Sequence, residues 1–242
     1  IHLSSYGLDP ESAGKETLID LIEAVSKIPG IERIRLGSFE PMIIKEDFVK
    51  RLSAVEKICP HFHLSLQSGC DATLKRMNRQ YTTEEYAHSV DLLRKYFDSP
   101  AITTDVITGF PGETEEEFAA TVEFLKKIAF YEIHVFPYSK REGTKAATMK
   151  GQLPKAVKKE RSNVLLSLTA EDSKKYRASF IDHEVSVLLE EPLTIDGEKY
   201  MTGYTPEYVK VAVKKEALSP NTVIKGTVKG FLLDDLMLLN DL

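Results

Sequence analysis

Apolar residues between Ile1 and Pro154 follow two alternating spacings, one typical of helices and the other typical of strands. The strand-like segments are 31–36, 62–66, 101–107 and 131–136. Because strand starts recur about every 30 to 40 residues, as in βα units, we expect a parallel sheet. The helix-like segments between them have these predicted buried positions: Leu18, Ile19, Ile22 and Val25; Phe48, Leu52 and Val55; Tyr86, Val90 and Leu93; Phe118, Val122 and Leu125.

The stretch 102–114 joins a β-branched strand, an acid at Asp105, a Gly-Phe-Pro-Gly loop and a helix start. Thr114 and Glu117 form a capping box, as Thr82 and Glu85 do for another helix. Glycines allow a ligand to approach the backbone, and a helix N-terminus offers unpaired N–H groups. Taken alone, however, the loop is more simply a short βα connection.

After residue 154 the pattern changes twice. Residues 154–180 predict one long, charged helix with Val157, Val164, Leu165 and Leu168 as its buried positions. The segments 185–191, 208–214, 222–228 and 235–239 are short and strand-like, with Pro, Gly and Asn turns between them. They predict a small antiparallel barrel. We therefore expect two domains, 1–180 and 181–242.

Polar residues follow every predicted strand of the first domain. In a parallel βα barrel the loops after the strand C-termini hold the ligand, so these residues predict one shared binding site. Arg79 suits a carboxylate or phosphate there, although a surface salt bridge is the commoner role of such an arginine. Glu40 and Asp105 suit ribose hydroxyls or an ammonium group. The residues after the strands are Ser4, Ser5 and Tyr6; Ser38, Glu40 and Pro41; Gln67, Ser68 and Gly69; Asp105 and Gly109; and Tyr138, Ser139 and Arg141.

Composition narrows the class of protein. The 242 residues are 42% hydrophobic and 29% charged, with a net charge of −5, which disfavours bulk attraction to nucleic acid but allows a local patch.

No apolar run of about 18 residues and no signal peptide is present, so we expect no membrane partner. Cys59 and Cys70 are too few for a four-thiolate site and suggest a reducing cytoplasm. His61 and His63 share a strand face and are interpreted as structural or as adjacent to the mouth of the site, not as ligands, and no metal site is predicted.

Four motifs in this order resemble the radical S-adenosylmethionine (SAM) methylthiotransferases. They are R-L-G-S-F-E-P, H-L-S-L-Q-S-G-C-D-A-T-L-K-R-M-N-R, T-T-D-V-I-T-G-F-P-G-E-T and Y-S-K-R-E-G-T. The resemblance covers nearly the whole chain, and G-Y-T-P-E-Y-V-K-V at 203–211 looks like the TRAM module of that family. Within the family, the likeness is strongest to the enzymes that add a methylthio group to position 2 of N6-threonylcarbamoyladenosine in tRNA.

The resemblance implies an α/β fold, a partial open (βα) radical-SAM barrel followed by a TRAM-like, RNA-binding β-barrel. By motif position it implies SAM contacts at Ser5, Glu40, Gln67, Arg79, Asp105 and Gly109, with Arg79 on the methionyl carboxylate. It also implies substrate contacts at Tyr138 and Arg141, and tRNA as the partner, with no role for DNA. In the family, one [4Fe-4S] cluster cleaves SAM to a 5′-deoxyadenosyl radical, and sulfur and methyl are then added through a second cluster.

The sequence departs from the family where the clusters would bind. The C-x-x-x-C-x-x-C loop should precede Ile1, and neither Cys59 nor Cys70 replaces it. We therefore expect a fragment that holds no cluster, has no catalytic residue of its own and is inactive, although its full-length parent is an enzyme.

Three other functions stay open. The first is a relative that modifies a ribosomal-protein aspartate, against which the basic Arg141 argues. The second is a noncatalytic RNA-binding protein whose terminal barrel carries a lysine track, although a solvated strand face explains those lysines equally well. The third and least favoured is a barrel lyase without a cluster. The track would consist of Lys210, Lys214, Lys215, Lys225 and Lys229.

Overall fold

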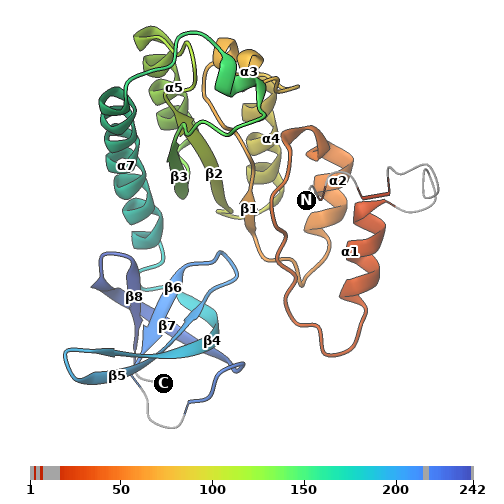
Figure 1. The fold of residues 1–242 in the computed structure, drawn as a ribbon. Helices are drawn as coiled ribbons and strands as arrows, with labels where there is room; N and C mark the ends of the chain where they lie inside the picture. Colours follow the sequence, from red (N-terminus) through yellow and green to blue (C-terminus); the bar gives the residue numbers. More distant parts are fainter. Residues whose placement is uncertain (1–2, 4–5, 8–16, 215–217, 241–242) are drawn as a thin grey trace.

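A computed structural model describes residues 3, 6–7, 17–214 and 218–240. Two units follow one another along the chain, joined by the long helix α7 (Lys155–Ala178) (Figure 1). The first contains a three-stranded parallel sheet, and the second is a closed barrel. The predicted α/β class is confirmed. Within the described residues, no helix combines the length and apolarity needed to cross a membrane.

The parallel sheet has the order β1 (His61–His63), β2 (Ala101–Thr108) and β3 (Glu132–Pro137). His63 pairs with Thr103, and Asp105 pairs with His134. Side chains two residues apart on a strand share one face. One sheet face therefore carries the alternate residues 61 and 63 of β1, 103, 105 and 107 of β2, and 132, 134 and 136 of β3.

The predicted strand over 31–36 is wrong, because this segment pairs only at isolated points. Ile34 bridges to Ile58, and Phe39 bridges to Leu64. The predicted strand 62–66 is likewise shortened to β1. The Thr104 hydroxyl takes the place of a backbone group beyond the end of β1. It accepts a hydrogen bond from the Leu66 N–H at 3.0 Å and donates one to the Leu64 carbonyl at 2.5 Å. A side chain thus replaces a backbone partner, and regular pairing ends there.

Helices surround this sheet, and their predicted apolar stripes pack inward. Tyr86, Val90 and Leu93 of one helix are fully buried. The capping boxes at Thr82 and Thr114 are both confirmed. The helices of this unit are α1 (Leu18–Ser26), the 3₁₀ helix η2 (Pro41–Ile43), α2 (Glu46–Ser53), α3 (Asp71–Arg76), α4 (Thr83–Tyr96), α5 (Glu115–Ile128) and α6 (Lys145–Thr148).

Helix α7 buries the predicted Leu165, but it also buries a polar stripe that was not predicted. Val164 is 44% exposed, whereas Thr169 and Ser173 are buried. The reason is that α7 lies against β3, the edge strand of the sheet, whose backbone groups need partners. The Ile133 N–H donates to Thr169 Oγ1 at 2.8 Å, and Ser173 Oγ donates to the Tyr131 carbonyl at 2.5 Å. The hydroxyls of α7 thus serve as the missing neighbouring strand.

The second unit closes in the order β4-β5-β6-β8-β7. Pairing is antiparallel except between β6 and β8, which run parallel, so the prediction of a purely antiparallel barrel is corrected. Strand β5 was not predicted, although the Asp196-Gly197 turn before it has φ values of 49° and 83°, as tight hairpins require. The strands are β4 (Glu184–Ile195), β5 (Glu198–Tyr204), β6 (Lys210–Val213), β7 (Val223–Leu233) and β8 (Leu236–Leu239).

Polar and aromatic contacts join the two units. Arg33 donates to the Tyr204 carbonyl at 2.9 Å and to both the carbonyl and the hydroxyl of Ser186 at 3.0 and 2.9 Å. The Arg35 guanidinium lies 3.8 Å from the centre of the Tyr208 ring. The segment that failed to form a strand therefore serves as the link to the terminal barrel.

Candidate functional site

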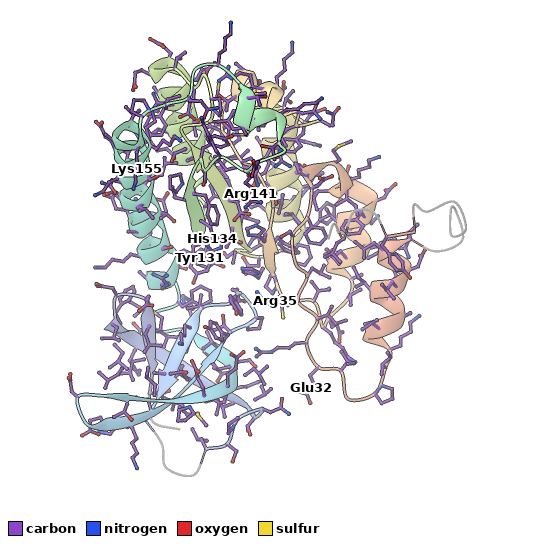
Figure 2. The ribbon with its side chains drawn as sticks, viewed as in Figure 1. Glu32, Arg35, Tyr131, His134, Arg141 and Lys155 are labelled. Atoms are coloured by element: carbon purple, nitrogen blue, oxygen red, sulfur yellow. The ribbon has the colours of Figure 1, made fainter. Side chains whose placement is uncertain are left out.

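Two cavities open on the same face of the parallel sheet. The upper cavity, of about 480 Å³, lies at the C-terminal ends of β2 and β3. The lower cavity, of about 490 Å³, lies nearer the terminal barrel and includes Tyr208 in its wall. Arg141 marks the upper level in Figure 2, and Arg35 lies at the level of the terminal barrel.

The upper cavity brings together four of the predicted site residues, which are Gln67, Asp105, Tyr138 and Arg141. They come from three separate strand exits, as the parallel arrangement predicts. Its volume falls in the range of small-molecule sites, about 300 to 1,000 Å³. The remaining lining is mainly apolar or small: Ile107, Phe110, Phe136, Pro137, Ser139, Thr144 and Ala146.

Gln67 is held in an uncommon backbone conformation. Its φ is 72°, in the left-handed region that a non-glycine residue rarely adopts. Its N–H donates to the Asp105 carbonyl at 2.8 Å, and its own carbonyl accepts from Ile107 N–H at 2.9 Å. These two bonds lock Gln67 against β2 at the cavity floor. Backbone strain that is fixed by its surroundings is a feature of ligand sites.

Asp105 is oriented by a histidine. His63 Nε2 lies 3.4 Å from Asp105 Oδ2, and His63 Nδ1 lies 3.0 Å from Thr103 Oγ1. The hydrogen bond from His63 lowers the pKa of the Asp105 carboxyl, and partial burial opposes this shift. Asp105 is therefore a carboxylate at neutral pH and accepts hydrogen bonds at the boundary between the two cavities.

Tyr138 places an unused polar group at the upper cavity. Its hydroxyl is shielded from solvent and has no hydrogen-bond partner among the described residues. Its ring packs edge-on against Phe110, with 5.3 Å between ring centres. Lys158 Nζ donates to the Tyr138 carbonyl at 2.9 Å and so ties this loop to α7. A buried hydroxyl without a partner is costly, which suits a site that a ligand completes.

Gly109 does not offer its backbone to the cavity. Its N–H donates to Glu113 Oε2 at 2.8 Å, and the Lys158 side chain fills the space where a Cβ would lie. The Gly109 N–H is therefore already bonded within the loop. The next residue, Phe110, is the part of this loop that lines the upper cavity. A direct contact between Gly109 and a cofactor stays a prediction that the geometry does not favour.

Glu40 and Arg79 lie outside the lining of the upper cavity, but near its floor. Both act on the Tyr81 hydroxyl, whose pKa is raised to about 12, mainly by burial. That hydroxyl donates to the carbonyls of Ser65 and Leu66, immediately before Gln67. Arg79 Nε is shielded and has no hydrogen-bond partner within the described residues. Ser5, also predicted as a contact, lies outside the described residues.

The lower cavity has a different chemistry. His61 is only 6% exposed, and its Nδ1 has no partner in the described part of the chain. Burial, followed by the charge of Arg35, lowers the pKa of His61 to about 4. Its ring centre lies 5.3 Å from that of Tyr208. The full lining is Arg35, Leu36, Gly37, Ser38, His61, His63, Thr103, Glu132, His134 and Tyr208.

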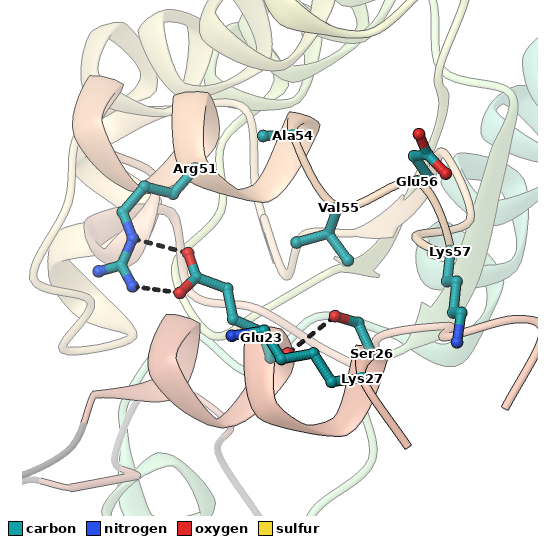
Figure 3. A pocket seen from close by; sticks show the side chains of 8 residues that line it. All are labelled: Glu23, Ser26, Lys27, Arg51, Ala54, Val55, Glu56 and Lys57. Carbon is teal, nitrogen blue, oxygen red and sulfur yellow. Dashed lines mark hydrogen bonds and ion pairs between the residues drawn. The ribbon is translucent and has the colours of Figure 1, made fainter. Parts of the chain in front are cut away.

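A third hollow, between α1 and α2, is a groove between charged side chains (Figure 3). Arg51 donates to both oxygens of Glu23 and to Asp20. The hydrogen bonds that Arg51 donates to Glu23 and Asp20 raise its pKa. Because its charges already pair with one another, this groove is not the candidate site.

Two features at or near the upper cavity were not predicted from the sequence. Phe136 is 51% exposed, and its position two residues after His134 was the available signal that it shares the cavity face. The second feature is a buried ion pair, in which Arg161 Nη1 lies 2.5 Å from Glu113 Oε2 and both side chains are at most 4% exposed. No local pattern joins these residues, which lie 48 positions apart.

Comparisons with known proteins agree with the fold and the motifs. The family model described as "Radical SAM superfamily" matches residues 7–125. The chain is 40% identical over 215 residues to "Threonylcarbamoyladenosine tRNA methylthiotransferase MtaB" of Bacillus subtilis, covering 88% of this chain and 47% of that protein. It is 41% identical over 204 residues to "tRNA-2-methylthio-N(6)-dimethylallyladenosine synthase" of Acetivibrio thermocellus, covering 84% of this chain and 42% of that protein. The chain thus spans about half the length of these curated relatives.

A solved structure shows a related fold. The structure of coproporphyrinogen III oxidase from Escherichia coli, a radical SAM enzyme, aligns with a TM-score of 0.52 and 17% identity. The alignment covers 67% of this chain and 38% of that one. At this identity the likeness concerns the fold alone.

Proposed function

Because this chain belongs to the radical SAM methylthiotransferase family, we propose that it forms the SAM-binding part of a tRNA-modifying enzyme. The product would be the 2-methylthio derivative of N6-threonylcarbamoyladenosine. The observation that carries the proposal is the upper cavity, where Gln67, Asp105, Tyr138 and Arg141 converge at the ends of the parallel strands.

The upper cavity has groups that match the parts of SAM. Phe110 and Phe136 provide apolar surface for the adenine ring. The Asp105 carboxylate, held by His63, accepts hydrogen bonds from the ribose hydroxyls. The Tyr138 ring, packed against Phe110, adds to the same wall. Together these groups bind and orient the cofactor and exclude water from it.

Arg79 is the proposed partner of the methionyl carboxylate. Its shielded Nε lacks a partner among the described residues, and a carboxylate would complete the guanidinium fork. Glu40 stands on the same side, near Tyr81, and suits the positive end of the methionyl group. A SAM molecule in the upper cavity would reach these two side chains only where its methionyl group extended past the cavity lining, to which neither Arg79 nor Glu40 belongs.

The cysteines of this chain do not fit a [4Fe-4S] cluster. In the family the cluster supplies the electron that cleaves SAM, and a C-x-x-x-C-x-x-C loop holds it. This sequence contains two cysteines. Cys59 is buried and its N–H donates to Ile34, whereas Cys70 precedes α3. We propose that the chain alone binds SAM without cleaving it, and that cluster ligands would have to come from residues outside this sequence.

tRNA is the proposed partner of the exposed Arg141 and of the terminal barrel, to which we give a TRAM-like role. The lysine track predicted on that barrel is only partly available. Lys210 lies 3.4 Å from Glu191, and Lys214 pairs with Glu198 at 2.5 Å. Lys215 lies outside the described residues, which leaves Lys225 and Lys229 exposed on β7. Recognition of tRNA would therefore depend on the cavity mouth as well as on the barrel.

A second candidate substrate is N6-dimethylallyladenosine in tRNA, favoured by the 41% identity to a protein of that name. Mass spectrometry of tRNA nucleosides from cells lacking this gene distinguishes the two substrates. We expect loss of 2-methylthio-N6-threonylcarbamoyladenosine and accumulation of its precursor. Loss of the methylthio form of the dimethylallyl nucleoside would instead establish the second candidate, and an unchanged nucleoside profile would refute both.

SAM titration tests the site itself. Arg79→Gln should weaken SAM binding by roughly tenfold, because an ionic hydrogen bond contributes about 1.5–3 kcal/mol. Arg51→Gln is the matched control, since Arg51 lies in the groove between α1 and α2. Equal affinities for the wild type and Arg79→Gln would remove Arg79 from the proposed site.

A further inference from the structure

We propose that His63, Asp105 and His134 form a binding site for a divalent transition metal ion such as Zn²⁺. One ligand atom from each residue lies within 4.8 Å of the other two. Two imidazole nitrogens and one carboxylate oxygen are a ligand set that suits zinc and neighbouring metals. The evidence for this site is the arrangement of three side chains, and it does not depend on the proposed function.

The register of the sheet explains why these residues meet. Asp105 pairs directly with His134, and His63 pairs with Thr103, two residues before Asp105 on the same face. The three side chains therefore project from three adjacent strands into one layer. That layer separates the cavities, since His63 and His134 line the lower one and Asp105 lines the upper one.

The geometry needs little adjustment to hold an ion. Metal–ligand bonds of about 2.0–2.2 Å place tetrahedral ligand atoms roughly 3.4 Å apart. His63 Nε2 and Asp105 Oδ2 already lie 3.4 Å apart. His134 is exposed, so rotation of its side chain can bring the third ligand inward. Three protein ligands also leave a coordination position open toward the cavities, as catalytic zinc sites do.

The Thr103 hydroxyl fixes the orientation of the His63 ring. His63 Nδ1 lies 3.0 Å from Thr103 Oγ1, so the ring can donate its Nδ1–H there while a metal ion replaces the proton that Nε2 shares with Asp105. Metal-binding histidines commonly have such an outer partner. The site also has neighbouring negative charge, because Glu132 lines the lower cavity beside His134. The Arg35 guanidinium, which also lines this cavity, lies over the Tyr208 ring.

Asp105 can serve both the metal and SAM, because a carboxylate has two oxygens. Oδ2 faces His63. The other oxygen remains available to the upper cavity, where the proposed ribose contact would lie. Metal binding is therefore to be measured first without SAM, so that failure of one proposal does not decide the other.

The test is Co²⁺ titration of the untagged 242-residue chain, followed by competition with Zn²⁺. The wild type should bind one Co²⁺ per chain and show a ligand-field absorption band, which Zn²⁺ abolishes. His134→Ala should weaken Co²⁺ binding on the order of 100-fold or more, and Thr103→Val by about 10- to 100-fold. His134 is exposed, so its removal leaves the core intact.

His88→Ala is the matched control, because His88 is an exposed histidine on α4, away from the layer. It should bind Co²⁺ as the wild type does. The proposal is overturned if the wild type shows no band and no stoichiometric binding. It is equally overturned if His134→Ala and the wild type bind Co²⁺ with the same affinity and spectrum, which would mean adventitious surface binding.

Discussion

The upper and lower cavities share one sheet face but differ in what builds them. The upper cavity is formed by strand ends and the loops that follow, and it presents aromatic rings, the Asp105 carboxylate and Arg141. The lower cavity is formed by the middle of the sheet and by Tyr208 of the terminal barrel, and it presents histidines and Arg35. A shift of two residues along each strand thus replaces a lining of aromatic rings and Asp105 by one of histidines.

The walls of the two cavities are also held in place by different parts of the chain. The upper wall depends on α7, through Lys158 and the Glu113–Arg161 pair. The lower wall depends on docking of the terminal barrel, through the hydrogen bonds of Arg33. Variants on one side should therefore leave the other side unchanged.

Removing the buried arginine should have the largest effect. Arg161→Met leaves Glu113 without its ionic partner inside the protein, and breaking such a pair costs about 3–5 kcal/mol of unfolding free energy. Urea denaturation measures this loss. Lys159→Met, on the exposed side of the same helix, is the control and should stay within about 0.5 kcal/mol of the wild type. A loss below about 1 kcal/mol for Arg161→Met would show that the pair does not support the upper wall.

His61 should make the lower cavity sensitive to acid. Burial lowers its pKa to about 4, against 6.5 for the ordinary side chain. The unfolded chain therefore binds a proton first as pH falls below 6.5, and the folded state loses stability until about pH 4. This difference corresponds to about 3 kcal/mol between pH 7 and pH 4.

His61→Phe tests this pH dependence, because it keeps an aromatic ring and removes the titrating group. Unfolding free energies at pH 7 and pH 4 should differ by about 3 kcal/mol less in this variant than in the wild type. His88→Phe, at an exposed position, should retain the wild-type pH dependence. If His61→Phe and the wild type lose equal stability on acidification, His61 is not held neutral by its surroundings.

Removing Arg33 should have a smaller effect, confined to the junction where the first unit contacts the terminal barrel. Arg33→Ala removes charge-assisted hydrogen bonds to Tyr204 and Ser186 and should cost about 2 kcal/mol of unfolding free energy. Glu32→Ala, the exposed neighbour, should be nearly neutral. SAM titration of Arg33→Ala should match the wild type, because the upper cavity does not include the junction. A weakened SAM affinity would mean that the two cavities are coupled.

Much of this arrangement could be predicted from the sequence because it depends on local chemistry. The capping boxes at Thr82 and Thr114 and the stripes of α4 and α5 formed as their spacing predicted. The convergence of Gln67, Asp105 and Tyr138 followed from the rule that parallel strands end on one side of a sheet.

The remainder depends on long-range partners that no local pattern shows. Thr169 and Ser173 are buried because they bond to the edge of β3, and a helix read alone would place them in solvent. The segment 31–36 has strand-like composition, but Arg33 bonds to the terminal barrel instead. The meeting of His63, Asp105 and His134 depended on the register between three strands, which spacing does not fix.

The most direct test of the upper cavity as the SAM site compares two matched carboxylates on one sheet face. Asp105→Asn and Glu132→Gln are the same change, one at the upper cavity and one at the lower. Calorimetric titration with SAM should show binding weakened by roughly tenfold, about 1.4 kcal/mol, for Asp105→Asn and unchanged within about twofold for Glu132→Gln. Weaker binding in Glu132→Gln together with wild-type affinity in Asp105→Asn would contradict this placement of the cofactor.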